Sequence, residues 1–321
     1  MIGAGSFARG TLAPGLQAAG MQASAVVSAS GLSAESMRQR FGFESAHADP
    51  DDILNRDDLD LIVIATRHDS HARLAAAALT AGVSVYVEKP LALDWQELSA
   101  VIDAQRSSGA ALFVGFNRRF APFATELRGL RGPKLMAYRV NAGLLGPNHW
   151  LNDLSIGGGR LKGEGCHFID FLCDQAAGDP VSVSAHGFPS EAGLALVSTD
   201  NFSVQVVFSD DSVGTLNYGA NAPSGPGKER FEVIAQDAYG VIEDFKTAEV
   251  WRTRDKRKLG GRRQDKGFGA QFRFVHDVVA GRHAPPAPES YFLSTIATLA
   301  AARSLETGEP EPVLEAPSPR S

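Results

Sequence analysis

Glu164, His167 and Asp170 lie in the middle of the chain, and residues of these types at this spacing could carry out acid–base chemistry. Side chains three residues apart in a helix lie along one face, so the three could face the same way. A histidine between two carboxylates is held in one tautomer and can take the proton of a hydroxyl group. A buried histidine whose hydrogen bonds are satisfied in the core fits the same spacing. The pattern therefore leaves two interpretations of His167, a general base and a core residue.

Lys89 is a second candidate, because it follows the short apolar run 83–87 within the sequence Glu88-Lys89-Pro90. Such a run predicts a buried strand, and ligands of open α/β sheets bind at the carboxyl ends of the strands. A lysine at that place can stabilise a developing alkoxide and position a substrate hydroxyl. The alternative is a surface ion pair between Glu88 and Lys89.

The chain opens with a G-x-G-x-x-A pattern that is typical of a dinucleotide-binding turn. Gly3 permits a tight turn, Gly5 lets a pyrophosphate approach the backbone, and Ala8 keeps the following helix close to the sheet. The N-terminus of that helix offers N–H donors to the phosphates. A turn built only from small residues is the alternative. The expected cofactor contacts here are Gly3, Gly5, Ser6, Phe7 and Ala8.

The end of the next predicted strand should carry an acidic residue if the loop reads the ribose of NAD. The sequence there is Val27-Ser28-Ala29-Ser30-Gly31, and Glu35 is the first carboxylate downstream. Without a carboxylate to repel a 2′-phosphate, the site has no barrier to NADP, so the cofactor is expected to be NAD or NADP. Ser28 and Ser30 are the expected contacts at this end, and their alternative role is to cap the next helix.

Short apolar runs alternate with longer amphipathic stretches over the first 115 residues, which predicts βαβ units and a parallel sheet. Ser33 and Asp94 are expected N-caps of two of the helices. The predicted strands are 25–27, 61–65, 83–87 and 111–115, and the predicted helices are 33–41, 70–81 and 95–107.

After Arg119 the pattern changes to long alternating stretches, which predict a mainly antiparallel sheet with one covered and one open face. Hairpin turns are expected at 210–211 and 238–240, helices at 163–177 and 290–307, and a solvated loop at the basic stretch 252–263. The fold class is therefore α/β, with a Rossmann domain over residues 1–119 and an α+β domain for substrate binding and oligomerisation over 120–321. The predicted strands of the second domain are 134–141, 181–187, 202–208, 212–218, 231–236 and 240–245.

Five segments in this order resemble the glucose-fructose oxidoreductase/inositol dehydrogenase (Gfo/Idh/MocA) family: 66–71, 87–91, 115–120, 157–160 and 164–170. The resemblance runs from Gly3 to about Gly178, and the Glu-Lys-Pro element is its most specific part. In finer detail the chain looks like the C-terminal module of bidomain bacterial oxidoreductases. Because only two residues precede Gly3, we expect either residues missing from the start or a longer natural protein.

The resemblance implies roles for the loops after two of the predicted strands. Lys89 would steady the oxyanion, Glu88 would lie near the nicotinamide, and Pro90 would fix the turn, with a cis peptide bond as one option. His71 is placed on the nicotinamide side, although a histidine at the start of a helix is more often structural. Thr66 and Arg67 belong to the same cofactor-contacting loop. Relatives often carry proline at the position of Arg67, so an anionic substrate is one possibility.

The expected substrate contacts are Asn117, Arg119, Arg160, His167 and Asp170. Asn117 and Arg119 could equally pin the domain junction through salt bridges. Family dehydrogenases usually carry an aspartate four residues before the histidine, and here that position is Gly163. Either Glu164 substitutes as a catalytic residue, or the substrate differs, or activity is weak.

The function that follows is NAD(P)-dependent oxidation of a secondary alcohol on a sugar, cyclic polyol or nucleotide-sugar. The alternatives are an NAD-dependent glycosidase and a catalytically weak nucleotide-binding regulator of the same family. The net charge of −6 argues against a general nucleic-acid binder. No apolar run is long enough to span a membrane, so a cytoplasmic protein is expected. No metal site is expected, and the open sheet face should pair with a second subunit in a homodimer or homotetramer.

Overall fold

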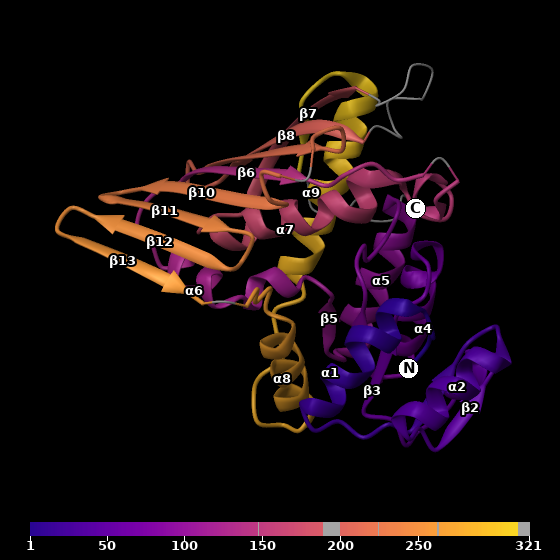
Figure 1. Cartoon of the computed structure of the whole chain (residues 1–321). Coiled ribbons are helices and arrows are strands. Elements are labelled where there is room, and N and C mark those ends of the chain that lie inside the picture. The colour runs from indigo at the N-terminus through magenta and orange to yellow at the C-terminus, as the bar shows by residue number, and fades with distance from the viewer. Residues whose placement is uncertain (147, 189–199, 224, 262, 314–321) are drawn as a thin grey trace. The chain divides into compact units, whose positions relative to one another are not determined.

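The computed structural model describes residues 1–146, 148–188, 200–223, 225–261 and 263–313 (Figure 1). The chain forms two compact units. Unit 1 comprises Met1–Gly115 and Phe268–Pro288, and unit 2 comprises Phe116–Gly267 and Glu289–Ser321. The main boundary falls four residues before the expected division at 119. The segment Phe268–Pro288 belongs to unit 1 because Phe272 and Val275 are buried in a cluster with Tyr86 of that unit.

Unit 1 is built on a parallel sheet, as predicted. β1 (Ala25–Val27) pairs with β2 (Ser45–His47), and β3 (Leu61–Ile64), β4 (Ser84–Val87) and β5 (Leu112–Val114) form the rest. Ile2 joins the two parts, because it makes parallel bridges to Val27 and to Ile64. β1, β3, β4 and β5 are short and almost wholly buried, which is why they appear as continuous apolar runs in the sequence. β2 is only half-buried and was not predicted.

The predicted helices of unit 1 are present as α2 (Gly31–Phe41), α4 (His71–Thr80) and α5 (Trp95–Ser108). Asp94 caps α5 as expected, because its side chain accepts a hydrogen bond from the N–H of Glu97. The prediction for Ser33 was wrong, since α2 begins at Gly31 after the N-cap Ser30. The helix α8 (Phe268–Val279) was not predicted, and α3 (Asp51–Leu54) is a single turn.

The helix that follows the glycine loop begins with a π-helical turn, η1 (Ala8–Leu12), before α1 (Ala13–Ala18). Pro14 explains this turn. Proline has no N–H to donate to the carbonyl four residues earlier, and its ring crowds that carbonyl. The wider turn accommodates it, with the N–H of Ala13 bonding to the carbonyl of Ala8.

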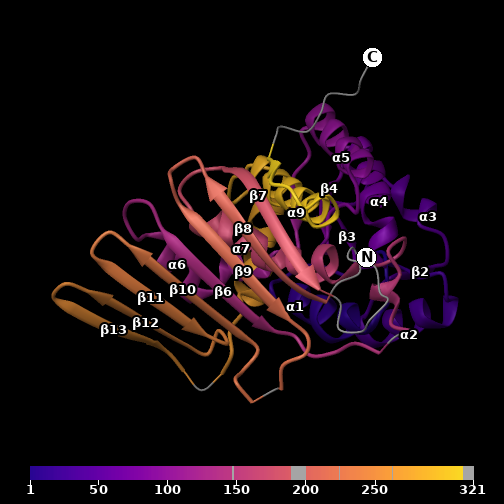
Figure 2. The same ribbon diagram turned by 90° about the horizontal axis from the view of Figure 1, so that it is seen from above.

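Unit 2 is built on a large open sheet with nine strands among the described residues, in the order β13-β12-β11-β10-β6-β9-β8-β7-β14 (Figure 2). Neighbours are antiparallel except β6 and β9, which are parallel. Side chains alternate between a buried and an open face, and α7 and α9 supply residues to the core on the buried face. The strands are β6 (Leu135–Asn141), β7 (Pro180–Phe188), β8 (Asn201–Phe208), β9 (Val213–Gly219), β10 (Glu229–Ala235), β11 (Ala238–Glu243), β12 (Thr247–Arg252), β13 (Asp255–Gly260) and β14 (Glu311–Pro312).

Both helices that the sequence predicts for the second half are present in unit 2. The first is a π-helical turn, η5 (Leu161–Gly165), continued by α7 (Cys166–Gln175), and the second is α9 (Glu289–Thr307). The 3₁₀ turns η3 (Asn117–Phe120) and η4 (Trp150–Asn152) and the short helix α6 (Pro122–Arg128) complete the unit. No helix among the described residues is long and apolar enough to cross a bilayer.

Two predictions for the second half were wrong. The basic stretch after residue 252 is not a loop, because Asp255–Gly260 pairs along its length with β12. Its exposed charges are those of an edge strand, where lysine discourages pairing with other chains. The second hairpin turn lies at Gln236 and Asp237, since residues 238–240 already pair with β10. The turn predicted at 210–211 is confirmed between β8 and β9.

Candidate functional site

The two glycines of the loop in unit 1 have different surroundings. Gly3 has φ +110°, and a Cβ there would collide with the carbonyl oxygen of Ala65, so the fold itself requires glycine. A Cβ on Gly5 would meet nothing within 4 Å. Gly5 therefore has an open side along its backbone, as a pyrophosphate needs. Ala8 is buried, while Ser6 and Phe7 are exposed at the start of the helix. These residues fit a dinucleotide.

The end of β1 has no carboxylate to read a ribose. The N–H of Ser28 bonds to the carbonyl of His47 at 3.1 Å, and Ser30 is the N-cap of α2 without a side-chain capping bond. Glu35 is paired with Arg38 at 2.8 Å, and this partner lowers the pKa of Glu35 to about 2. The structure therefore places Ser28 and Ser30 at this strand end and engages Glu35 elsewhere.

Lys89 lies at the carboxyl end of β4 and is partly exposed, and the Lys89–Pro90 peptide bond is cis. His71 is fully buried behind this turn. Its Nδ1 atom lies 2.8 Å from the carbonyl oxygen of Pro90, and its Nε2 atom lies 3.3 Å from that of Thr66. Burial lowers the pKa of His71 to about 4, so the ring is neutral at neutral pH. The neutral ring donates to one of these two carbonyls and lies between the two loops, while Arg67 is exposed.

Glu88 is buried next to Lys89. The hydroxyl of Tyr86 donates to its Oε1 atom at 3.0 Å. A Cβ at Gly115 would lie 2.7 Å from its Oε2 atom, so glycine at 115 leaves the room that this carboxyl fills. Burial raises the pKa of Glu88 to about 7, although Lys89 and the Tyr86 hydroxyl both act in the opposite direction.

In unit 2, His167 lies in the first turn of α7 and is partly exposed. Its ring meets the rings of Phe116 and Phe168, with centroids 6.3 Å away in both cases. The π-helical turn η5 precedes it directly and contains Gly163 and Glu164. π-Helical turns often occur at functional sites, because they re-aim the side chains of a helix.

Glu164 is held by two donors. The Nε atom of Arg160 lies 2.8 Å from its Oε2 atom, and the hydroxyl of Tyr218 donates to the same carboxylate. Arg160 is buried, and it also bonds to the Tyr218 oxygen at 2.7 Å and to the carbonyl of Gly143 at 3.1 Å. The buried guanidinium of Arg160 is thus bonded to Glu164, Tyr218 and Gly143. Sequence reasoning missed Tyr218, which lies 54 residues from Glu164.

Arg119 and Asp170 form a buried ion pair. The Arg119 guanidinium bonds to both carboxylate oxygens of Asp170, and to Ser290 and Ser294 of α9 at 2.9 and 3.0 Å. Burial raises the pKa of Asp170 to about 6, and Arg119 opposes this rise. Asn117 is also buried and donates to the carbonyl of Lys266 at 2.7 Å. Asn117 and Arg119 thus make all of these bonds within unit 2, and the bonds decide neither for substrate binding nor for a salt bridge at the domain junction.

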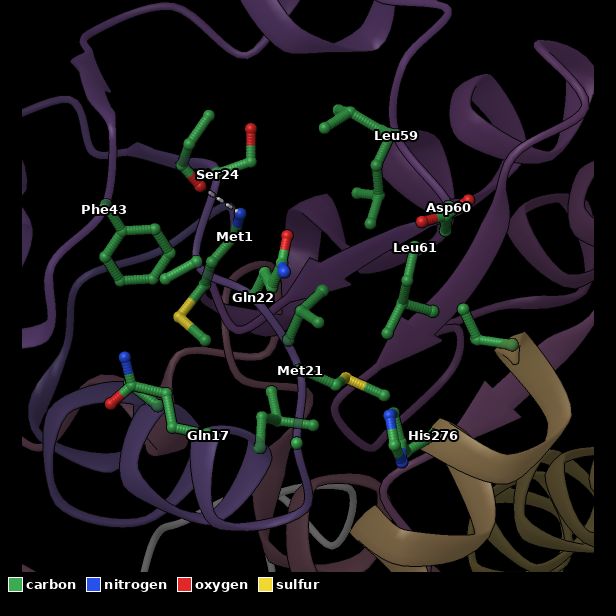
Figure 3. A pocket seen from close by; sticks show the side chains of 18 of the residues that line it. Met1, Gln17, Met21, Gln22, Ser24, Phe43, Leu59, Asp60, Leu61 and His276 are labelled. Atoms are coloured by element: carbon green, nitrogen blue, oxygen red, sulfur yellow. Dashed lines mark hydrogen bonds between the residues drawn. The ribbon is translucent and has the colours of Figure 1, made fainter.

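A cavity of about 540 Å³ in unit 1 lies away from these residues (Figure 3). It is at the amino ends of the parallel strands, and Figure 3 shows Met1, Met21, Phe43 and Leu61 around it. The amino group of Met1 donates to the carbonyl of Ala25 at 2.6 Å. Ligands of open α/β sheets bind at the opposite, carboxyl edge, so this cavity is not the dinucleotide site.

Two family models match the chain. Residues 1–116 match the NAD-binding Rossmann fold of the Gfo/Idh/MocA oxidoreductase family, and residues 134–239 match a Gfo/Idh/MocA C-terminal domain. A levoglucosan dehydrogenase from Pseudarthrobacter phenanthrenivorans is 32% identical over 241 residues, which are 68% of this chain and 57% of that protein. A 4-carboxy-2-hydroxymuconate-6-semialdehyde dehydrogenase from a Sphingobium species is 29% identical over 59% of this chain. The chain spans 57% and 61% of the lengths of these two relatives.

Solved structures share the whole fold. An oxidoreductase domain protein from Kribbella flavida superimposes with a TM-score of 0.86 at 18% identity, covering 98% of both chains. A levoglucosan dehydrogenase solved with NADH and levoglucosan superimposes with a TM-score of 0.81 at 20% identity, again over 98% of both.

Proposed function

Because the chain belongs to the Gfo/Idh/MocA oxidoreductase family, we propose that it catalyses the reversible NAD(P)-dependent oxidation of a secondary alcohol on a sugar or cyclic polyol. The observation that carries this proposal is the difference between the two glycines of the loop. Gly3 is required by the fold, and Gly5 leaves its backbone open at the N-terminus of a helix. A family model for NAD binding matches the same residues.

Lys89 and His167 are the proposed catalytic residues. When bound, a nicotinamide would supply the hydride chemistry at the alcohol carbon. In the oxidation, His167 takes the proton of the substrate hydroxyl at one of its ring nitrogens. Lys89 holds the substrate oxygen and stabilises its negative charge as the proton leaves. Both side chains are partly exposed, as residues that touch a substrate must be.

Glu164 is the proposed third member of the catalytic group. It would replace the aspartate that family dehydrogenases usually carry at the position of Gly163. Arg160 and Tyr218 both donate to its carboxylate, which favours the ionised form. An ionised carboxylate accepts hydrogen bonds from hydroxyl groups, so Glu164 would bind a hydroxyl of a polyol. Arg160 and Tyr218 would position it.

The proposed substrate class follows the relatives, whose names include levoglucosan, inositol and dihydrodiol dehydrogenases. The exposed Arg67 adds a positive charge to the loop after β3, and this charge would attract an anionic group on the substrate. We propose that the protein acts in the cytoplasm, where its two free cysteines, Cys166 and Cys173, stay reduced.

The open face of the large sheet supports a homo-oligomer. Ile234 pairs with Leu135, and Leu135 pairs with Val213, so apolar side chains form a row across three strands on this face. Leu135 is 57% exposed and Ile234 is 54% exposed. Tyr239 and Trp251 extend the row. A second subunit covering this face would give the homodimer or homotetramer that the sequence predicts.

A catalytically weak regulator is the second candidate function, because Gly163 departs from the family pattern. A single screen separates the two candidates. Purified protein is incubated with NAD⁺ or NADP⁺ and a panel that includes levoglucosan, myo-inositol and scyllo-inositol. Formation of reduced cofactor supports the dehydrogenase. Binding of cofactor and sugar without turnover on any member would favour the regulator, and hydrolysis of glycosides without net reduction would favour the glycosidase.

A further inference from the structure

Glu88 is a buried carboxylate in the cofactor unit for which the proposed reaction names no chemical step. It lies at the carboxyl end of β4, directly before Lys89. Gly115 at the end of β5 leaves the space that its carboxyl fills, and Tyr86 donates to it. Two neighbouring strand ends therefore provide a fitted place for this one acid group at the edge of the sheet where ligands bind.

The surroundings of Glu88 suit both its ionised and its neutral form. The hydroxyl of Tyr86 lies 3.0 Å from Oε1 of Glu88 and 3.4 Å from Oε1 of Gln271. Gln271 is held in turn, because it donates to the carbonyl of Val114 at 2.9 Å. When Glu88 is ionised, Tyr86 donates to it. When Glu88 is protonated, it can donate to the Tyr86 oxygen while Tyr86 donates to Gln271.

The charged group that acts on Glu88 is the neighbouring Lys89, which lowers the pKa of the carboxyl. Tyr86 acts on it through its hydroxyl, and α8 contributes the uncharged Gln271. Burial outweighs these partners and raises the pKa of Glu88 to about 7, so both forms are populated at neutral pH. The charge next to Lys89 thus changes by one unit in the physiological range.

We propose that Glu88 sets the preference of this site between NAD⁺ and NADH, and that it favours the oxidised form only while its carboxyl is ionised. This inference rests on the proposed function, because it needs the dinucleotide bound at the glycine loop. The oxidised nicotinamide ring carries one positive charge that the reduced ring lacks. A carboxylate in poorly solvated surroundings attracts that charge more strongly than it would in water.

The sign of the pH dependence follows from proton balance. NAD⁺ binds the ionised form better, so its affinity rises as the pH rises through about 7. Binding near that pH draws the proton from neutral Glu88 and releases it to the buffer. NADH has no ring charge to attract, so its affinity stays nearly constant over the same range.

The test is calorimetric titration of NAD⁺ and of NADH into the whole protein at pH 6 and pH 8, in two buffers with different protonation enthalpies. NADP⁺ is avoided because its 2′-phosphate also titrates near pH 6. The expected result is NAD⁺ affinity about tenfold higher at pH 8, since ionisation of a group with a pKa of about 7 changes about tenfold across this range. The buffer dependence should report close to one released proton at pH 6 and about a tenth of one at pH 8, because Glu88 is mostly protonated at the lower pH and mostly ionised at the higher. NADH affinity should change by less than about threefold.

Glu88→Gln should abolish the pH dependence for NAD⁺ and lower its affinity at pH 8, with little effect on NADH. Glu44→Gln is the matched control, because Glu44 is exposed and precedes β2 at the opposite edge of the sheet. Equal losses for NAD⁺ and NADH in Glu88→Gln would overturn the inference and leave Glu88 a packing role. Persistence of the pH dependence in that variant would also overturn it.

Tyr86→Phe is the second variant, for use if Glu88→Gln does not fold. It removes a donor to the ionised carboxylate, so the pH at which NAD⁺ affinity rises should move upward. An unchanged midpoint would contradict the inference. If wild-type protein binds neither nucleotide, the proposed function fails first, which distinguishes that outcome from a failure of Glu88 alone.

Discussion

Gly3 lies so close to Ala65 that a Cβ atom at position 3 would overlap the carbonyl oxygen of residue 65. Gly5, two residues further on, has no atom near the place of its Cβ. The packing of the chain on itself therefore requires glycine at position 3 and leaves position 5 open, where we propose that the pyrophosphate approaches.

Substitution at these two glycines should have opposite consequences. Gly5→Val should fold with little change in melting temperature, because a Cβ atom at this position meets no protein atom within 4 Å. It should lose the rise in melting temperature that NAD⁺ gives the wild type. Gly3→Ala should lower the melting temperature without any ligand, because of the clash and its φ of +110°. A thermal shift that survives in Gly5→Val would remove the glycine loop from the cofactor site.

NADP⁺ should bind at least as well as NAD⁺. The end of β1 offers Ser28 and Ser30 where an acidic residue would repel a 2′-phosphate, and Glu35 is paired with Arg38. Parallel titrations of the two cofactors check this. A preference for NAD⁺ of more than about a hundredfold, or about 2.7 kcal/mol, would mean that an acidic residue from another part of the chain reads the ribose.

The apolar row on the open sheet face should hold subunits together. Leu135→Glu places a charge in the middle of the row and should shift the protein toward monomers in light scattering at micromolar concentration. Gln96→Glu is the control, because Gln96 is an exposed polar residue of α5 in unit 1 and does not belong to the large sheet. A wild-type protein that is strictly monomeric would contradict the proposed interface.

The ion pair between Arg119 and Asp170 should matter for stability far more than a surface pair. Arg119→Met leaves the buried carboxylate of Asp170 without its cation, which typically costs about 3–5 kcal/mol. Arg282→Met breaks the exposed pair with Asp277 and should cost less than about 1 kcal/mol. Urea unfolding measures both. Equal losses in the free energy of unfolding for the two variants would contradict the burial of the Arg119–Asp170 pair.

Much of the fold could be predicted from local sequence, and much of the site could not. The buried strands of unit 1 are continuous apolar runs, so their positions follow from hydrophobicity alone. β13 was missed because an exposed edge strand carries the charges of a loop. Tyr218 and Gln271 were missed because each meets its partners across a long stretch of chain, 54 residues from Glu164 and 157 residues from Val114. No local pattern reports such contacts.

The most direct test of the account is the rate of cofactor reduction on a proven substrate, measured for wild type, His167→Ala, Lys89→Ala and the double variant. If His167 takes the hydroxyl proton, its loss should lower turnover by roughly 10² to 10⁴, with cofactor affinity little changed. Lys89→Ala should cost a comparable factor, and the double variant should be much less than multiplicatively slower, because the two residues act in one step. Gly163→Asp should leave turnover unchanged or lower, since in our proposal Glu164 takes the place of the aspartate. Near-normal turnover in His167→Ala would contradict the account and make the carboxylate of Glu164 the base to test.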